Sequence, residues 1–261
     1  MVKFLSQLKL YKIYLVEKLS IDPILYRYFN WSLFMFDGQA SVILEQSQLS
    51  EEIISRKIIG GRIKRILDMI IAIIAFIIFI PLFVAIPFLI RLSDDGPILF
   101  RQTRIGYGGR SFTCLKFRSM VPDANRVLKT LLATDPAARR EWEENQKLID
   151  DPRITALGKL LRKSSLDELP QLVNVIMGDM SLVGPRPIVA AEMWRYGDKL
   201  GYYLQARPGI TGLWQVSGRN DCGYDQRIRM DADYVRNWRL SRDIIILLKT
   251  IFVVIKQKGS Y

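Results

Sequence analysis

Two adjacent carboxylates, Asp167 and Glu168, are the residues of this chain best placed to do chemistry. They lie in residues 163–187, whose sequence is KSSLDELPQLVNVIMGDMSLVGPRP. The chain contains no histidine. Any proton, phosphoryl or metal chemistry must therefore use carboxylates, lysines, arginines, tyrosines or hydroxyl groups. This restriction makes the carboxylate pair the leading candidate for a reactive centre.

The spacing around the pair also permits a purely structural role. Ser165 and Glu168 are spaced as in a capping box, with Ser165 as N-cap and Glu168 at the third helical position. Glu168 would then satisfy a backbone N–H, and Asp167 would complement the helix dipole. For isolated motifs this structural role is favoured. The same position suits a nucleophile, because a helix N-terminus keeps a carboxylate ionised.

The pair could also hold a divalent ion. Without histidine or a cysteine cluster, that ion would be a hard, oxygen-preferring one such as Mg²⁺. The two cysteines, Cys114 and Cys222, form no CxxC motif and no disulfide framework, which fits a reducing, cytosolic setting. The first residues lack the pattern of a secretory signal peptide.

Composition indicates an unusual environment. Hydrophobic residues make up 49% of the chain, and the formal net charge is +12. Together they indicate contact with an anionic membrane surface or a phosphorylated substrate. Nucleic acid is a weaker interpretation, because no zinc-finger, homeodomain or RNP pattern is present, and we expect no nucleic-acid partner.

One apolar segment dominates the hydropathy. Residues 69–90 run for 22 positions without a charge, and as one helix they would extend about 33 Å, enough to cross a bilayer core of ~30 Å. Basic residues flank the segment on both sides, although such residues favour the cytoplasmic side. Pro81 interrupts the run and would break or kink a helix. Both a re-entrant helix and a kinked single span are compatible with this pattern.

The remaining chain predicts a mainly helical α+β protein. Residues 97–120 read as a β-hairpin around a glycine turn at Gly106–Gly109. Helices are expected over 123–148, 157–177 and 244–255, the last in a core or at an interface. The predicted organisation is an N-terminal segment of unknown role over 1–60, a membrane helix over 61–92 and a catalytic domain over 93–261.

Four ordered blocks carry a resemblance to a known family. They are KRILD at 64–68, DGPILFRQTRIGYGGRSFTCLKFRSM at 95–120, DPRITALGKLLRKSSLDELPQLVNVIMGDMSLVGPRP at 151–187 and RPGITGLWQVSGRN at 207–220. The chain resembles the bacterial sugar transferases, the monotopic polyprenyl-phosphate phosphoglycosyl transferases. The C-terminal blocks are most similar to the branch that loads galactose or glucose phosphate onto undecaprenyl phosphate.

This resemblance implies a two-step exchange. Asp167 would attack the β-phosphate of a UDP-hexose, releasing UMP and leaving a covalent sugar-phosphoryl-aspartate. Undecaprenyl phosphate would then take the sugar phosphate, which would prime exopolysaccharide, capsule or O-antigen synthesis. Glu168 would support Asp167, and the two together would hold Mg²⁺.

The basic residues within these blocks are expected to bind substrate phosphates, since guanidinium groups bind phosphate in a bidentate manner. Any one of them alone could be a simple surface charge, and two of them, Arg162 and Arg186, are the strongest candidates. The full set is Lys116, Arg118, Arg162, Arg186 and Arg207.

The resemblance also implies a location. It favours the re-entrant form with its break at Pro81, contact with membrane lipid, and a catalytic domain on the cytoplasmic side of the bacterial inner membrane. The chain departs from the family in having Ile80-Pro81 where Ser-Pro is frequent. The hexose, the particular glycan and the oligomeric state, for which a homodimer is one candidate, stay open.

Two other functions compete with this one. A non-catalytic membrane module could bind polyprenyl phosphate or recruit enzymes of glycan assembly, and basic, membrane-docked character alone would suffice for it. A conventional glycosyltransferase would need a metal-binding DxD motif. Only Asp231-Ala232-Asp233 has that spacing among the pairs considered, and it lies in a helix-like charged region, so this interpretation is weak.

Overall fold

The computed structural model describes residues 58–145, 148–218 and 223–255. These residues are mainly helical, with a two-stranded antiparallel hairpin and a short parallel strand pair. The predicted mainly helical α+β class with a hairpin is therefore confirmed. The predicted N-terminal segment lies almost wholly outside the described residues, as does Cys222, and its role stays a prediction.

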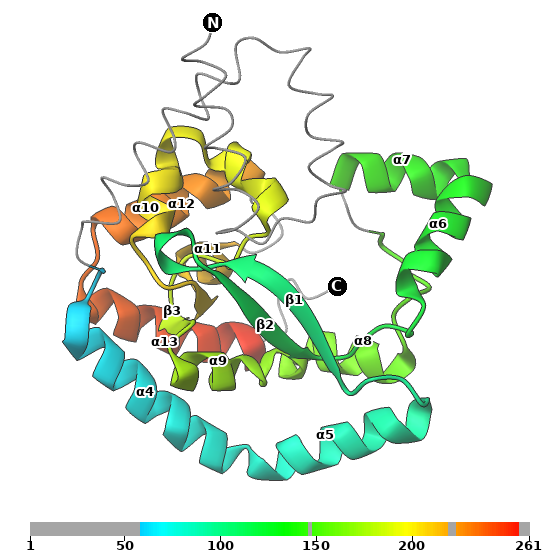
Figure 1. Cartoon of the computed structure of the whole chain (residues 1–261), viewed down its shortest axis with the longest axis horizontal. Coiled ribbons are helices and arrows are strands. Elements are labelled where there is room, and N and C mark those ends of the chain that lie inside the picture. The colour runs from blue at the N-terminus through cyan, green and yellow to red at the C-terminus, as the bar shows by residue number, and fades with distance from the viewer. Residues whose placement is uncertain (1–57, 146–147, 219–222, 256–261) are drawn as a thin grey trace, which may run out of the picture.

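Helices both precede and follow the hairpin along the chain (Figure 1). The helices are α4 (Gly61–Ile78), α5 (Ile80–Ser93), α6 (Ala124–Thr134), α7 (Pro136–Asn145), α8 (Ala156–Lys163), α9 (Gln171–Met177), α10 (Leu200–Leu204), α11 (Leu213–Ser217), α12 (Tyr224–Arg236) and α13 (Leu240–Ile255). The strands are β1 (Leu99–Ile105), β2 (Ser111–Phe117), β3 (Ser181–Val183) and β4 (Gly209–Thr211). Three 3-10 segments are η1 (Tyr107–Gly109), η2 (Leu166–Glu168) and η3 (Ala190–Lys199).

Helices α4 and α5 form a bent pair that runs along the lower edge of the molecule (Figure 1). The two axes differ by 60°. The turn residue is Phe79, and Pro81 lies in the first turn of α5, where its missing N–H costs no intrahelical bond. The predicted break is therefore confirmed, with the bend two residues before the proline. Pro87 lies inside α5, which continues through it to Ser93.

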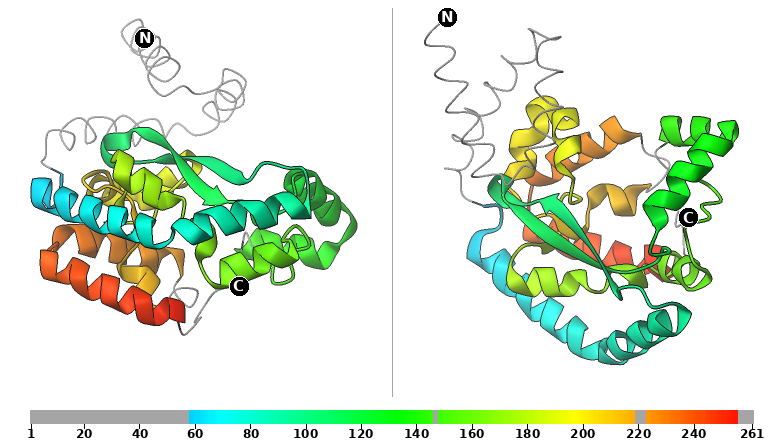
Figure 2. Two further views of the ribbon diagram at one scale, coloured as in Figure 1. Left: turned by 90° about the horizontal axis from the view of Figure 1, so that it is seen from below. Right: turned by 45° about the vertical axis from the view of Figure 1, so that its right-hand side comes forward.

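Among the described residues, no helix is by itself long and apolar enough to cross a membrane, whereas α4 and α5 meet that test as a bent pair. Seen from below, α4, α5 and α13 lie on one face of the molecule (Figure 2). Large apolar side chains are exposed on all three. They include Ile70, Ile74, Ile77 and Ile78 on α4, Val84, Phe88 and Leu92 on α5, and Ile244, Leu248, Ile251 and Phe252 on α13. Exposed apolar side chains in such numbers on neighbouring helices indicate an interaction surface.

A buried polar network fastens α4 to the rest of the protein. Lys64 Nζ donates to Asp243 Oδ2 of α13 at 2.6 Å, and Ser181 Oγ of β3 donates to Asp68 Oδ2 at 2.7 Å. Asp243 also accepts from Tyr234 Oη at 2.7 Å. Because both charges of the Lys64–Asp243 pair are buried, each requires the other to remain in the interior. The KRILD block thus anchors the start of the bent helix pair in the protein interior.

The hairpin lies across α9. Strand β1 pairs with β2 so that Leu99 faces Phe117 and Ile105 faces Ser111. At the turn Gly108 and Gly109 adopt left-handed φ values of 64° and 78°, which explains the glycine-rich sequence there. The hairpin predicted over residues 97–120 is confirmed. Within the helical region predicted over 123–148, the described residues form α6 and α7, whereas the helix predicted over 157–177 is interrupted by η2.

Replacing Asp243 by alanine should strongly destabilise the fold. Lys64, Tyr234 and Trp238 would each lose a buried acceptor, and breaking a buried ion pair typically costs about 3–5 kcal/mol. Urea titration of the purified protein would measure the change in free energy of unfolding. The matched control is Asp198→Ala, whose carboxylate is exposed and pairs only with the neighbouring Lys199 within the described residues, and which should change stability by less than about 0.5 kcal/mol. Equal effects of the two changes would contradict a structural role for the network.

Candidate functional site

Asp167 and Glu168 lie in η2, a single 3-10 turn between α8 and α9. Ser165 has φ 58° and ψ 16°, the left-handed region, and its side chain makes no cap hydrogen bond. The predicted capping box is therefore wrong. Its spacing is present, but the turn is closed by the Glu168 N–H, which donates to the Ser165 carbonyl at 3.2 Å. Left-handed backbone at a residue other than glycine is strained and concentrates at functional sites.

The carboxylate of Glu168 is held from the hairpin. Lys116 Nζ of β2 lies 2.5 Å from Glu168 Oε1, and both side chains are about three-quarters buried. The position of Lys116 is fixed by Asn174 of α9, whose Oδ1 accepts from Leu115 N at 3.0 Å and whose Nδ2 donates to Thr113 O at 2.8 Å. One buried amide thus sets the register of β2 against the segment that carries the carboxylates.

Asp167 is buried, with 8% of its surface exposed. The pKa of Asp167 is raised to about 6, chiefly by burial and also by the neighbouring Glu168 carboxylate, whereas the charges of Lys116 and Arg162 act to lower it. Contrary to what the sequence predicted, a helix N-terminus does not account for the ionisation of this carboxylate. The segment η2 is only one turn long, and burial has the largest effect on the pKa of Asp167. Because pH 7 lies above this pKa, Asp167 would still be mainly ionised there.

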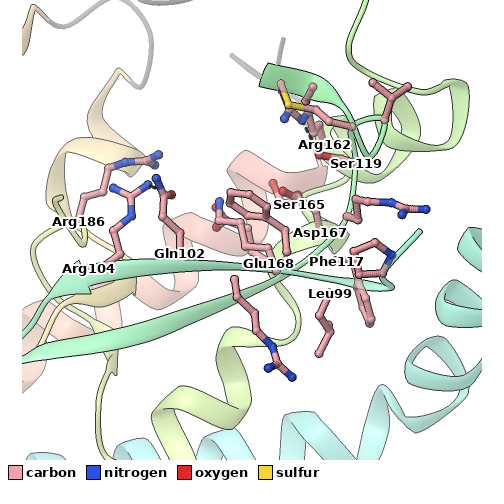
Figure 3. A pocket seen from close by; sticks show the side chains of 18 of the residues that line it. Leu99, Gln102, Arg104, Phe117, Ser119, Arg162, Ser165, Asp167, Glu168 and Arg186 are labelled. Carbon is pink, nitrogen blue, oxygen red and sulfur yellow. Dashed lines mark hydrogen bonds and ion pairs between the residues drawn. The ribbon is translucent and has the colours of Figure 1, made fainter. Parts of the chain in front are cut away.

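A cavity of about 670 Å³ opens over the pair (Figure 3). Its walls come from the hairpin, from the segment after β2, from η2 and α8, and from α11 and α12. In Figure 3, Asp167 and Glu168 lie between Arg104 and Arg186 on one side and Arg162 with Ser119 on the other. Buried carboxylates flanked by guanidinium groups on two sides form a site suited to a doubly charged or multiply charged anion.

The structure gathers most of the predicted basic residues around this cavity. Lys116, Arg118, Arg162 and Arg186 all line it. Arg207 does not, because its Nε donates to the Gly178 carbonyl at 2.8 Å in the loop after α9. The sequence around Arg207 in the RPG block does not indicate that this arginine lies outside the cavity.

Gln102 and Arg104 of β1 are site residues that the sequence interpretation missed. Arg104 Nη1 donates to Pro187 O at 2.9 Å, and its Nη2 donates to Gln102 Oε1 at 2.6 Å. Alternate residues of a strand share one face, and Gln102 and Arg104 lie on the face of the hairpin that carries Lys116. The period-two pattern of the predicted hairpin could have identified both.

Trp214 and Arg227 were also missed, and for these no local signal exists. The guanidinium groups of Arg186 and Arg227 lie 5.8 Å and 4.8 Å from the centre of the Trp214 ring. Such cation–π stacking positions the two arginines at one end of the cavity. Trp214 comes from α11 and Arg227 from α12, so only the tertiary fold brings them to Arg186.

The DxD interpretation does not fit the geometry. Asp231 is fully buried, and Tyr196 Oη donates to its Oδ2 at 2.9 Å. Asp233 points elsewhere and pairs with Arg242. Neither carboxylate lines the cavity.

The described residues offer few ligands for the predicted Mg²⁺ ion. Within residues 58–145, 148–218 and 223–255, no group of three or more His, Cys, Asp or Glu side chains could hold a metal ion. Asp167 and Glu168 nevertheless offer two hard carboxylates beside a cavity of phosphate-binding character. Mg²⁺ is commonly held by one or two carboxylates together with substrate phosphates and water, so this pair fits such an ion and does not form a complete protein cage.

Comparison with known proteins decides the family. Residues 59–257 match the family model described as bacterial sugar transferase. The chain belongs to this family. The resemblance read from the four sequence blocks is thereby confirmed.

Named relatives of this sugar transferase fall into two groups by length. It is 54% identical over 199 residues to the undecaprenyl-phosphate galactose phosphotransferase of Salmonella typhimurium, covering 76% of this chain but only 42% of that protein. It is 50% identical over 203 residues to the exopolysaccharide production protein ExoY of Sinorhizobium fredii, covering 78% and 90% of the two chains. A UDP-glucose:undecaprenyl-phosphate glucose-1-phosphate transferase of Caulobacter vibrioides is 39% identical over 212 residues, covering 76% and 72%. The chain thus spans less than half of the Salmonella relative and most of the rhizobial one.

Protonation of Asp167 should be observable near pH 6, and it should depend on Lys116. Replacing Lys116 by glutamine should raise the pKa of Asp167 above about 6, because a positive charge that lowers it is removed. The carboxyl stretching band in infrared difference spectra would follow the titration of each protein.

Subtracting the same titration of Asp167→Asn isolates this group. The subtraction is needed because burial also raises the pKa of Asp231, to about 8. An Asp167 band that titrates near pH 4 in the parent protein would contradict the buried environment of the site.

Proposed function

We propose that this chain transfers galactose-1-phosphate or glucose-1-phosphate from a UDP-hexose to undecaprenyl phosphate. The observation that carries the proposal is the buried Asp167–Glu168 pair in a cavity ringed by Lys116 and arginines, within a chain of the sugar transferase family. The relatives from Salmonella and Caulobacter support the substrate class, because both are named as transferases that act with undecaprenyl phosphate. The product would prime synthesis of an exopolysaccharide, a capsule or an O-antigen.

Asp167 is the proposed nucleophile. Its carboxylate oxygen attacks the β-phosphorus of the UDP-hexose, the bond from that phosphorus to the bridging oxygen breaks, and UMP leaves. In the second step an oxygen of undecaprenyl phosphate attacks the same phosphorus, and the Asp167 carboxylate leaves. Both attacking groups are anions without a proton to lose, so neither step requires a histidine as general base.

The other residues act by charge and position. Lys116, Arg162 and Arg186 are placed to neutralise the phosphoryl oxygens, which is the main contribution a protein makes to phosphoryl transfer. Glu168, fixed by Lys116, keeps a second carboxylate beside Asp167. Mg²⁺ would be held by this carboxylate pair and by phosphate oxygens, and when bound it would neutralise charge on the diphosphate.

The same proposal includes the membrane. We assign residues 61–92 to a re-entrant helix pair and residues 93–261 to a catalytic domain on the cytoplasmic face of the bacterial inner membrane. Support comes from the 60° bend between α4 and α5 and from the apolar side chains that they expose. A sharply bent pair of this length can enter and leave through one leaflet, which agrees with basic residues at both ends.

Asp167→Asn tests the reaction directly. It keeps the size of the side chain but removes the charged attacking oxygen, so turnover should fall at least about a thousandfold. Release of UMP from UDP-galactose or UDP-glucose, in the presence of Mg²⁺ and undecaprenyl phosphate, is the measurement. The control, Asp198→Asn, alters an exposed carboxylate and should retain activity. Turnover of Asp167→Asn near that of the parent, or release of UDP in place of UMP, would refute the mechanism.

Topology has a separate test. Single cysteines at Arg62 and Ser93, both exposed, would be introduced after Cys114 and Cys222 are replaced by alanine. The re-entrant arrangement predicts that a membrane-impermeant maleimide labels both positions only from the cytoplasmic side. Labelling of the two positions from opposite sides would establish a full span.

A further inference from the structure

The two ends of the cavity differ in chemistry. Gln102, Arg104, Arg186 and Arg227 line one end, which is polar and positively charged. The other end combines apolar residues with Arg118, Arg162 and Ser119. Its lining includes Pro97, Leu99, Phe117, Val121 and Pro122. In Figure 3, Leu99 and Phe117 lie toward the end of the hairpin away from Arg104 and Arg186, on the opposite face of the strands from the carboxylates.

The apolar end is continuous with the bent helix pair. Phe117 is almost fully buried in a cluster with Ile86 and Ile90 of α5 and Leu161 of α8. Its ring centre lies 5.8 Å from that of Phe83, near the start of α5. Helix α5 ends at Ser93, directly before the turn that contacts Arg118. A molecule with a long apolar chain would therefore meet this end of the cavity along α5.

Arg118 is held in an unusual position at this end. Only 7% of its surface is exposed, its backbone N–H donates to Ile98 O at 2.9 Å, and its Nη2 pairs with Asp94. The guanidinium packs closely against Gly96, where a Cβ atom would come within 1.7 Å of Nη1. Glycine at this position is thus required to admit the arginine.

The Nη1 group of Arg118 is buried without a hydrogen-bond partner among the described residues. A buried N–H group without an acceptor is costly, and such groups are rare in folded proteins. Asp94 engages Nη2, which orients the fork of the guanidinium but leaves Nη1 for another acceptor. The natural acceptor beside an arginine of this geometry is an anionic oxygen, above all that of a phosphate.

We propose that Arg118 binds the phosphate of the lipid acceptor, a polyprenyl phosphate whose first isoprene units lie on the apolar end of the cavity. The UDP-hexose takes the opposite end, because it is polar along its whole length and the residues there are mostly arginines. This assignment rests on the proposed function and divides its two substrates between the two ends. Asp167 lies between the two ends. The phosphorus that it takes from the UDP-hexose can therefore pass to the lipid phosphate.

The test measures the two half-reactions separately in the Arg118→Lys variant. Lysine keeps a positive charge beside Asp94 but lacks the paired N–H groups of the guanidinium. Without acceptor, formation of the labelled sugar-phosphate adduct and one equivalent of UMP should stay within about twofold of the parent. With saturating UDP-hexose, the KM for undecaprenyl phosphate should rise roughly 10- to 100-fold, as expected for loss of a hydrogen bond to a charged group. Arg118→Gln should show the same pattern more strongly.

The control is Arg126→Gln on α6, whose side chain is 80% exposed and pairs with Asp123. It should leave both half-reactions unchanged. Normal adduct formation by Arg118→Lys also shows that the variant is folded. If the variant slowed adduct formation as much as acceptor transfer, or left the KM for undecaprenyl phosphate unaltered, the assignment of Arg118 would be wrong.

A binding measurement keeps this inference separable from the covalent mechanism. In the Asp167→Asn background, Arg118→Lys should weaken binding of farnesyl phosphate roughly tenfold or more, while binding of UMP changes little. Weaker UMP binding with unchanged farnesyl phosphate binding would place Arg118 at the donor end and overturn the proposal. A parent protein that forms no adduct but binds farnesyl phosphate through Arg118 would refute the aspartyl intermediate alone.

Discussion

The side chain of Asn174 is the contact on which the site depends most. It is 2% exposed, and its amide bonds to the backbone of β2 on both sides of Cys114. Its own carbonyl accepts from Gly178, Asp179 and Met180, which ends α9 and directs the chain into β3. One buried amide therefore joins the hairpin, the helix after the carboxylates and the strand before the Gly-Pro-Arg-Pro turn. A buried polar group so fully satisfied fixes one arrangement of these parts.

That arrangement also sets the environment of Asp167, the proposed nucleophile of this histidine-free chain. Burial opposes ionisation of Asp167, whereas Lys116 and Arg162 favour it, and the result is a pKa of about 6. A carboxylate fully stabilised by salt bridges would be a poorer nucleophile, and one buried without cations would be protonated. The balance arises because Lys116 is already engaged by Glu168, so its charge acts on Asp167 from beside it.

The bent helix pair and the elements around the cavity pack together. Lys64 and Asp68 anchor α4 through Asp243 and Ser181, so the bent pair begins at a buried ion pair and hydrogen bond. Its second helix, α5, then packs on the hairpin through Phe117. The cavity thereby lies beside the bent helix pair, within reach of several arginines, which is compatible with the proposed reaction between a lipid phosphate and a sugar nucleotide.

The sequence by itself determined the features that depend on short-range chemistry. These are the uncharged run with its break near Pro81, the hairpin with its glycine turn, the adjacent carboxylates and the family blocks. Only the tertiary structure decided what each charge contacts. It replaced the capping box at Ser165 by a left-handed turn, turned Arg207 toward Gly178 and brought Trp214 and Arg227 to Arg186. The physical reason is that periodicity and turn propensity act over a few residues, whereas burial, ion pairing and pKa depend on side chains far apart in the chain.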